Sequence, residues 1–272
     1  MKLILMAVVI LAALYPRSAR AQDVALYDTV QTSSGLKYFY VKKGIGRKVE
    51  KGSEVSTCLS LMVKGKVVWT SFGEKDSVIT FVAGSDPMIK GFMEMTMLMR
   101  EGDEVVAILP DSLGYGAQES GDGAIPPFAT LVYNKFRMVK VSEPKCLLSD
   151  TLLAIIEKQD IAAMIETYQR ITSSSDSLKY VRGVAQMNAL WDALTRKGMY
   201  QQALDVISFY AKVDNGWQWR GLSVPTFERM GQLERALDTL KVLIHDFPNE
   251  PFLINYEKGL LERMSKPSEG KH

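Results

Sequence analysis

The spacing of apolar and polar residues changes about halfway along the chain. Between residues 34 and 141, short apolar runs are separated by glycine-containing turns, and residues 55–63 alternate with a period of two. That period is typical of a β-strand with one buried face. From residue 147 glycine becomes sparse and the apolar residues follow a helical period. The pattern therefore predicts a sheet-rich region followed by an all-helical one.

The sheet-rich region is predicted to hold several strands, one short helix and a final long hairpin. The helix is expected to start around residues 87–92 and to end near Met99. The strand-like runs lie at residues 34–44, 55–63, 67–69, 78–83 and 105–109, and another follows the Pro126-Pro127 pair. This order predicts an α+β arrangement in which a curved antiparallel sheet wraps around the helix.

The helical region contains a repeated sequence. GMYQQAL at residues 198–204 recurs as GQLERAL at 231–237, thirty-three residues later. The repeat resembles the tetratricopeptide repeat, in which glycine stands at the turn between paired helices and alanine where they touch. Residues 159–161 are a candidate degenerate earlier copy, and residues 252–264 are a candidate capping helix. Val224-Pro225 weakens the first helix of the second copy.

Two or three stacked repeats predict a short right-handed solenoid with a concave groove for a protein partner. Trp191, Trp217 and Trp219 are candidate groove residues, with core packing favoured for Trp191. A helical stack that serves only to stabilise the protein or to form dimers is the open alternative.

The N-terminus resembles a secretory signal peptide. Lys2 precedes an apolar run at residues 3–15, and Ala19-Arg20-Ala21 precedes a predicted cleavage after Ala21. A helix over this run spans about 20 Å, short of the roughly 30 Å of a bilayer core. We therefore expect an exported protein, periplasmic or secreted, with no membrane span after cleavage. An uncleaved anchor is the alternative.

These patterns predict six segments. They are a signal peptide at 1–21, a lead-in at 22–33, the sheet domain at 34–141, a linker at 142–146, the helical domain at 147–265 and a tail at 266–272.

Composition and charge argue against several classes of function. The 272 residues carry a formal net charge of +2, and removing Lys2, Arg17 and Arg20 leaves 30 basic against 31 acidic side chains. Without a basic stripe, a nucleic-acid partner is not expected. Only two histidines occur, His245 and the terminal His272, so neither a His-based triad nor a zinc site is expected. No P-loop or dinucleotide motif points to a cofactor.

Two cysteines, Cys58 and Cys146, leave two alternatives open. An oxidising compartment would allow them to pair. One lies in a strand-like run and the other just beyond the sheet domain, which favours two free thiols.

The sheet domain resembles the FKBP-type peptidyl-prolyl cis/trans isomerases. The resemblance rests on LPDSLGYG at 109–116 and AIPPFATLVY at 124–133, with further matches in SGLKY, FVAG, PMIKGF and REGDEVVAILP. It implies the FKBP fold, proline-containing polypeptides as substrates and no cofactor or metal.

The resemblance also implies a set of site residues. Tyr115 would hydrogen-bond the bound peptide, the Ile89 amide would donate to it, and Phe92 would form the pocket floor in place of a tryptophan. The other implied pocket residues are Val68, Trp69, Ile79, Phe81, Met88, Ile125 and Tyr133. Plain core packing is the alternative for the apolar ones, and Phe81 and Ile125 could play either role.

The chain departs from the family at two pocket walls. Val68 replaces a phenylalanine and Trp69 an aspartate, while an earlier strand tyrosine falls on Leu59 or Cys58. A smaller wall offers less contact area to a ligand. Two functions are therefore predicted: an isomerase that assists the folding of exported proteins or, alternatively, a catalytically weak binding or chaperone module. Five methionines at residues 88–99 fit a holding surface or a methionine-filled core.

Overall fold

The computed structural model describes residues 26–73, 77–85, 88–120 and 123–265. The predicted signal peptide at 1–21, residues 22–25 of the lead-in and the tail at 266–272 lie outside the described residues. None of the helices in the described ranges has the length and apolarity that a membrane crossing requires.

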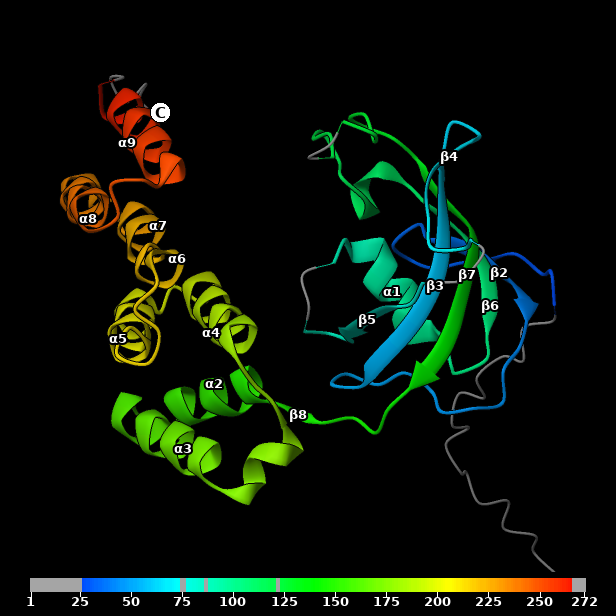
Figure 1. Cartoon of the computed structure of the whole chain (residues 1–272), viewed down its shortest axis with the longest axis horizontal. Helices are drawn as coiled ribbons and strands as arrows, with labels where there is room; N and C mark the ends of the chain where they lie inside the picture. Colours follow the sequence, from blue (N-terminus) through cyan, green and yellow to red (C-terminus); the bar gives the residue numbers. More distant parts are fainter. Residues whose placement is uncertain (1–25, 74–76, 86–87, 121–122, 266–272) are drawn as a thin grey trace, which may run out of the picture.

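The first part of the described chain is an antiparallel sheet of seven strands that curves around one short helix (Figure 1). The pairing order is β1-β2-β6-β7-β3-β4, with β5 paired to β3. The elements are β1 (Val30–Gln31), β2 (Lys37–Lys42), β3 (Glu54–Val63), β4 (Lys66–Thr70), β5 (Ile79–Val82), α1 (Lys90–Leu98), β6 (Glu104–Leu109), the 3₁₀ helix η1 (Asp111–Leu113) and β7 (Leu131–Val141). The predicted α+β fold is confirmed.

The central residues of strand β3 are buried on both faces of the strand. Cys58 is buried although it lies on the face opposite Leu59 and Leu61. The β4–β5 connection covers it, because the Cys58 thiol donates to the Ser77 carbonyl at 3.5 Å and the Leu59 amide donates to Ser71 Oγ at 2.9 Å. Cys58 and Cys146 are both free thiols.

The methionines of α1 fill the core. Met95 and Met99 are completely buried, and Met93 and Met97 pack against the same apolar cluster. Only Met88, before the helix, is substantially exposed. A methionine holding surface on this segment is therefore wrong, because the sheet curves around the helix and covers its apolar side.

The predicted linker at residues 142–146 is hydrogen-bonded to the chain at the start of β3. The Ser142 amide donates to the Glu54 carbonyl at 2.9 Å, and the Lys145 amide donates to the Gly52 carbonyl at 3.0 Å. Gly52 has a φ of +90°, and a Cβ there would lie 1.9 Å from the Lys145 carbonyl oxygen. Only glycine allows this approach.

The second part of the chain is helical. Its elements are β8 (Cys146–Leu147), α2 (Leu148–Lys158), α3 (Ile161–Ser173), η2 (Ser175–Lys179), β9 (Tyr180–Val181), α4 (Val184–Arg196), α5 (Tyr200–Tyr210), α6 (Trp217–Arg220), α7 (Ser223–Arg229), α8 (Leu233–Asp246) and α9 (Pro251–Ser265). Successive helices are stacked along one direction (Figure 1).

The two copies of the repeated sequence have the same local geometry. Gly198 lies between α4 and α5, and Gly231 between α7 and α8, each with a φ of +73°. Ala203 and Ala236 are completely buried, as close helix contacts require. Pro225 falls inside α7, and the first helix of the second copy is divided into the short α6 and α7.

Candidate functional site

The sheet part encloses an apolar pocket of about 350 Å³. The pocket residues come from β3, β4 and β5, from the start of α1, from the long β6–β7 loop and from β7. They are Leu59, Leu61, Val68, Trp69, Ile79, Met88, Ile89, Phe92, Tyr115, Ser120, Ala124, Ile125 and Tyr133.

The structure brings together all the predicted site residues except Phe81. Phe81 is 3% exposed and lies behind the floor, with its ring centroid 5.1 Å from that of Phe92. It therefore belongs to the core, one of the two roles that the sequence left open. Tyr115, Ile89 and Phe92 line the same pocket.

Four pocket residues were not among the predicted site residues. Leu61 follows Leu59 on the same face of β3, so the alternation of that strand could have found both. Ser120 and Ala124 lie in the loop, where no periodicity indicates which side chains turn inward. Their positions depend on the folded loop.

Aromatic stacking holds the pocket floor in place. The Phe92 ring lies 5.2 Å from that of Phe136 with 7° between their planes, and 5.9 Å from that of Tyr133. Phe92 and Phe136 are buried. Such packing gives the floor one well-defined position.

Gly91 allows the start of α1 to approach β6. A Cβ at Gly91 would lie 2.5 Å from Leu109 Cδ2. Ile89 is the N-cap residue of α1, and its amide donates no hydrogen bond to any described residue. The first amides of a helix have no partner inside the helix. Among the described residues the Ile89 amide therefore has no acceptor, and Ile89 lines the pocket.

The loop that carries Tyr115 is braced by backbone hydrogen bonds. The Gly116 amide donates to the Asp111 carbonyl at 3.0 Å, and the Phe128 amide donates to the Gly116 carbonyl. Ser120 Oγ accepts from the Ile125 amide at 2.9 Å. These bonds hold Tyr115 and Ile125 on the pocket side of the loop.

Two tyrosines line the pocket in different environments. Tyr133 is 5% exposed, whereas Tyr115 is 38% exposed. Burial raises the pKa of Tyr133, and the neighbouring Tyr115 raises it further. The Tyr133 hydroxyl therefore stays neutral at physiological pH, while Tyr115 is the accessible one.

The pocket is open to solvent. Trp69 is 45% exposed and Met88 is 38% exposed, so both side chains stand at the rim. The indole of Trp69 does not fill the pocket. Within the described ranges, no three His, Cys, Asp or Glu side chains cluster as a metal site would require.

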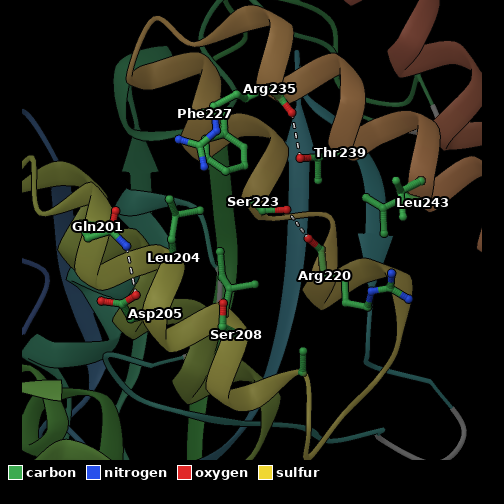
Figure 2. Close-up of a pocket in the computed structure, with 13 residues that line it drawn as sticks. Gln201, Leu204, Asp205, Ser208, Arg220, Ser223, Phe227, Arg235, Thr239 and Leu243 are labelled. Atoms are coloured by element: carbon green, nitrogen blue, oxygen red, sulfur yellow. Dashed lines mark hydrogen bonds between the residues drawn. The ribbon is translucent and has the colours of Figure 1, made fainter. Parts of the chain in front are cut away.

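The helical part has a more polar hollow of about 370 Å³ between α5, α7 and α8 (Figure 2). The Arg235 guanidinium lies 4.4 Å from the centroid of the Phe227 ring, and Arg220 pairs with Asp246. Gln201 donates to Asp205 within α5. These charged groups are engaged with neighbouring residues and do not converge on one point.

Comparison with known proteins places the sheet part in a family. The family model described as FKBP-type peptidyl-prolyl cis-trans isomerase matches residues 46–134. An FK506-binding protein of Neisseria meningitidis serogroup A is 30% identical over 103 residues, which cover 38% of this chain and 93% of the relative. The macrophage infectivity potentiator of Trypanosoma cruzi is 32% identical over 116 residues, covering 42% of this chain and 57% of that protein.

Among solved structures, the crystal structure of FkpA from Escherichia coli is 26% identical, with a TM-score of 0.38 and coverage of 43% of this chain and 52% of that one. The family model matches the part of the chain that builds the pocket, and the alignment with the Neisseria relative covers nearly all of that protein. The chain belongs to the FKBP-type peptidyl-prolyl cis-trans isomerases.

Proposed function

We propose that this chain catalyses cis/trans isomerisation of X-Pro bonds in exported polypeptides, with the pocket around Tyr115, Ile89 and Phe92 as its active site. One observation carries the proposal: a free backbone amide, an accessible phenol and an aromatic floor meet in a single apolar pocket. Export of the protein and its clients is proposed from the N-terminal signal-like sequence.

Such a pocket needs no covalent step to accelerate the reaction. The barrier of about 20 kcal/mol arises because amide resonance is lost when the bond twists. The twisted amide is less polar than the planar one, so an apolar pocket favours it over the ground state. Each tenfold of rate requires about 1.4 kcal/mol of that preference.

The proposed roles follow from where each group lies. The proline ring packs on Phe92 between Ile79 and Ile125. The Ile89 amide and the Tyr115 hydroxyl donate to the carbonyls that flank the rotating bond. These two donors fix the ends of the peptide while the bond turns.

The aliphatic walls favour a second candidate, a catalytically weak module that binds proline-containing chains. Leu59, Leu61 and Val68 stand at the wall, where aromatic rings would offer more contact area. The helical part supplies a partner contact in this second candidate, as expected for a tetratricopeptide-like stack.

A protease-coupled assay on a short proline peptide separates the two candidates. Tyr115→Phe should lower kcat/KM about three- to tenfold, because one hydrogen bond of about 0.5–1.5 kcal/mol is lost. Tyr27→Phe is the matched control, since Tyr27 is 64% exposed and lies outside the pocket.

Two outcomes would decide against the first candidate. Undiminished activity in Tyr115→Phe would show that the catalytic site is elsewhere. A folded wild-type protein that binds the peptide without accelerating its isomerisation would favour the second candidate.

A further inference from the structure

An apolar groove on the helical part takes no part in the proposed isomerase site. It lies between α6, α7 and α9 and encloses about 280 Å³. Its walls include Trp217, Pro225, Leu240, Phe252, Leu253 and Tyr256. None of the described residues that line it is charged, although Gln218 adds a polar amide, in contrast to the hollow in Figure 2, which Arg220, Arg235 and Asp205 line.

Three aromatic rings form one side of the groove. The centroids of Trp217 and Phe252 are 5.5 Å apart in a stacked arrangement, and those of Phe252 and Tyr256 are 5.8 Å apart. Phe252 is 57% exposed. Trp217 and Tyr256 pack against the buried cluster of the same helices, whereas the Phe252 ring is largely open to solvent and core packing alone explains it poorly.

The tryptophans of the helical part differ in their hydrogen bonding. Trp219 is 1% exposed and donates to the Ile207 carbonyl at 3.0 Å, so its predicted place in a groove was wrong. Half-buried Trp191 donates to Thr226 Oγ1 at 2.9 Å. The Trp217 indole N–H has no partner among the described residues. Trp217 and Gln218 thus bring side-chain donors without a described partner to the groove lining.

These properties restrict what can occupy the groove. A charged segment would lose its hydration there without gaining an oppositely charged partner. A proline residue has no amide donor to bury, its ring is apolar, and the carbonyl before it can accept from an indole N–H. Extended proline-rich segments bind to aromatic-lined grooves on this basis.

We propose that this groove binds a proline-containing extended segment of a client polypeptide, at a site separate from the isomerase pocket. Two such sites on one chain would hold a client through one proline while another enters the pocket. Tethering of this kind raises the local concentration of the client without any new contact in the pocket.

Fluorescence anisotropy with the full chain and a labelled peptide of ten prolines tests the inference. A glycine–serine peptide of the same length is the control ligand. Phe252→Ala should weaken proline-peptide binding about tenfold or more. Trp217→Phe, which keeps a ring but removes the donor, should weaken it about threefold or more.

Two further variants make the test specific. Ile254→Ala removes a 38% exposed apolar side chain from the same helix outside the groove and should leave binding unchanged. Tyr115→Ala alters the isomerase pocket and should also leave the groove affinity unchanged. Circular dichroism of each variant confirms that α9 remains folded.

The results also separate the groove from the proposed enzyme activity. Binding that is lost in Tyr115→Ala but retained in Phe252→Ala would overturn the groove and leave the isomerase proposal standing. A protein that binds the proline peptide in the groove but has no isomerase activity would contradict the proposed isomerase site and leave the groove proposal standing.

Other occupants of the groove would overturn the inference in recognisable ways. Tighter peptide binding after deletion of residues 266–272, which include Pro267, would identify the tail of the chain as the occupant. A dimer that dissociates in Phe252→Ala would identify a second copy.

Discussion

The proposed isomerase pocket and the helical groove are both apolar, but they are assembled over different distances along the chain. The pocket joins residues from Leu59 to Tyr133, carried by strands and loops that meet only in the folded sheet. The groove joins residues from Trp217 to Tyr256 on neighbouring helices. A pocket of the first kind depends on the whole sheet, and one of the second kind depends on local helix pairs.

The way each site is assembled explains why the pocket and the groove present different chemical groups. In the sheet part, the start of α1 and the long β6–β7 loop bring Ile89 and Tyr115 to an apolar wall, and we propose that the Ile89 amide and the Tyr115 hydroxyl are its hydrogen-bond donors. Helices satisfy most of their backbone groups internally, and the groove is lined mainly by apolar side chains, three of them aromatic. The first arrangement suits catalysis on a peptide bond, and the second suits binding.

The largest expected effect comes from Phe92→Ala. Removing this buried ring should lower the free energy of unfolding by about 3–5 kcal/mol and abolish isomerase activity. Hydrogen exchange should show lost amide protection throughout the sheet, because its strands share one core.

Trp219→Ala is the matched variant in the helical part. It removes an equally buried ring and should reduce protection around α5 to α7 while sparing the sheet. If either variant reduced amide protection equally in the sheet part and the helical part, the two parts would not be stabilised independently, as the comparison requires.

A smaller effect should come from the glycine between α7 and α8. Gly231→Ala should destabilise the chain by about 1 kcal/mol, because a side chain is strained at a φ of +73°. Gly259→Ala, within α9, should stabilise it by about 0.5–1 kcal/mol, because alanine favours helix. Thermal unfolding followed at 222 nm measures both, and equal signs would show that the turn does not require glycine.

The smallest expected effect is on the free energy of unfolding at high pH, and it comes from the buried Tyr133 hydroxyl. Burial raises the pKa of Tyr133 above its ordinary value of 10.0, so the unfolded chain releases this proton first as pH rises. Stability from the neutral phenol is complete below pH 10 and is lost above it. Between pH 10 and 11, the free energy of unfolding should fall by up to about 1 kcal/mol less in Tyr133→Phe than in the wild type.

Urea unfolding at several pH values measures this difference. Tyr27→Phe is the control, because it replaces a tyrosine that is 64% exposed. Identical slopes in wild type and Tyr133→Phe would show that the hydroxyl reaches water.

Much of the pocket could be predicted because its residues lie in continuous motifs. The glycines around Tyr115 and the PMIKGF segment with Ile89 and Phe92 identify themselves by order and spacing. Leu61 was missed because a strand period shows which residues share a face but not which of them reach a pocket. A register shift between Ser60 and Leu61 in the pairing of β3 with β7 adds to this ambiguity.

The sequence by itself determined the change from strands to helices, the equivalent glycine turns and the family motifs, because these depend on local spacing and residue type. Only the tertiary structure decided that Phe81 is core, that the methionines of α1 are covered, and that Trp217 rather than Trp219 lines a groove. The physical reason is that burial depends on what the rest of the chain places over a residue, and two tryptophans two positions apart carry the same local signal.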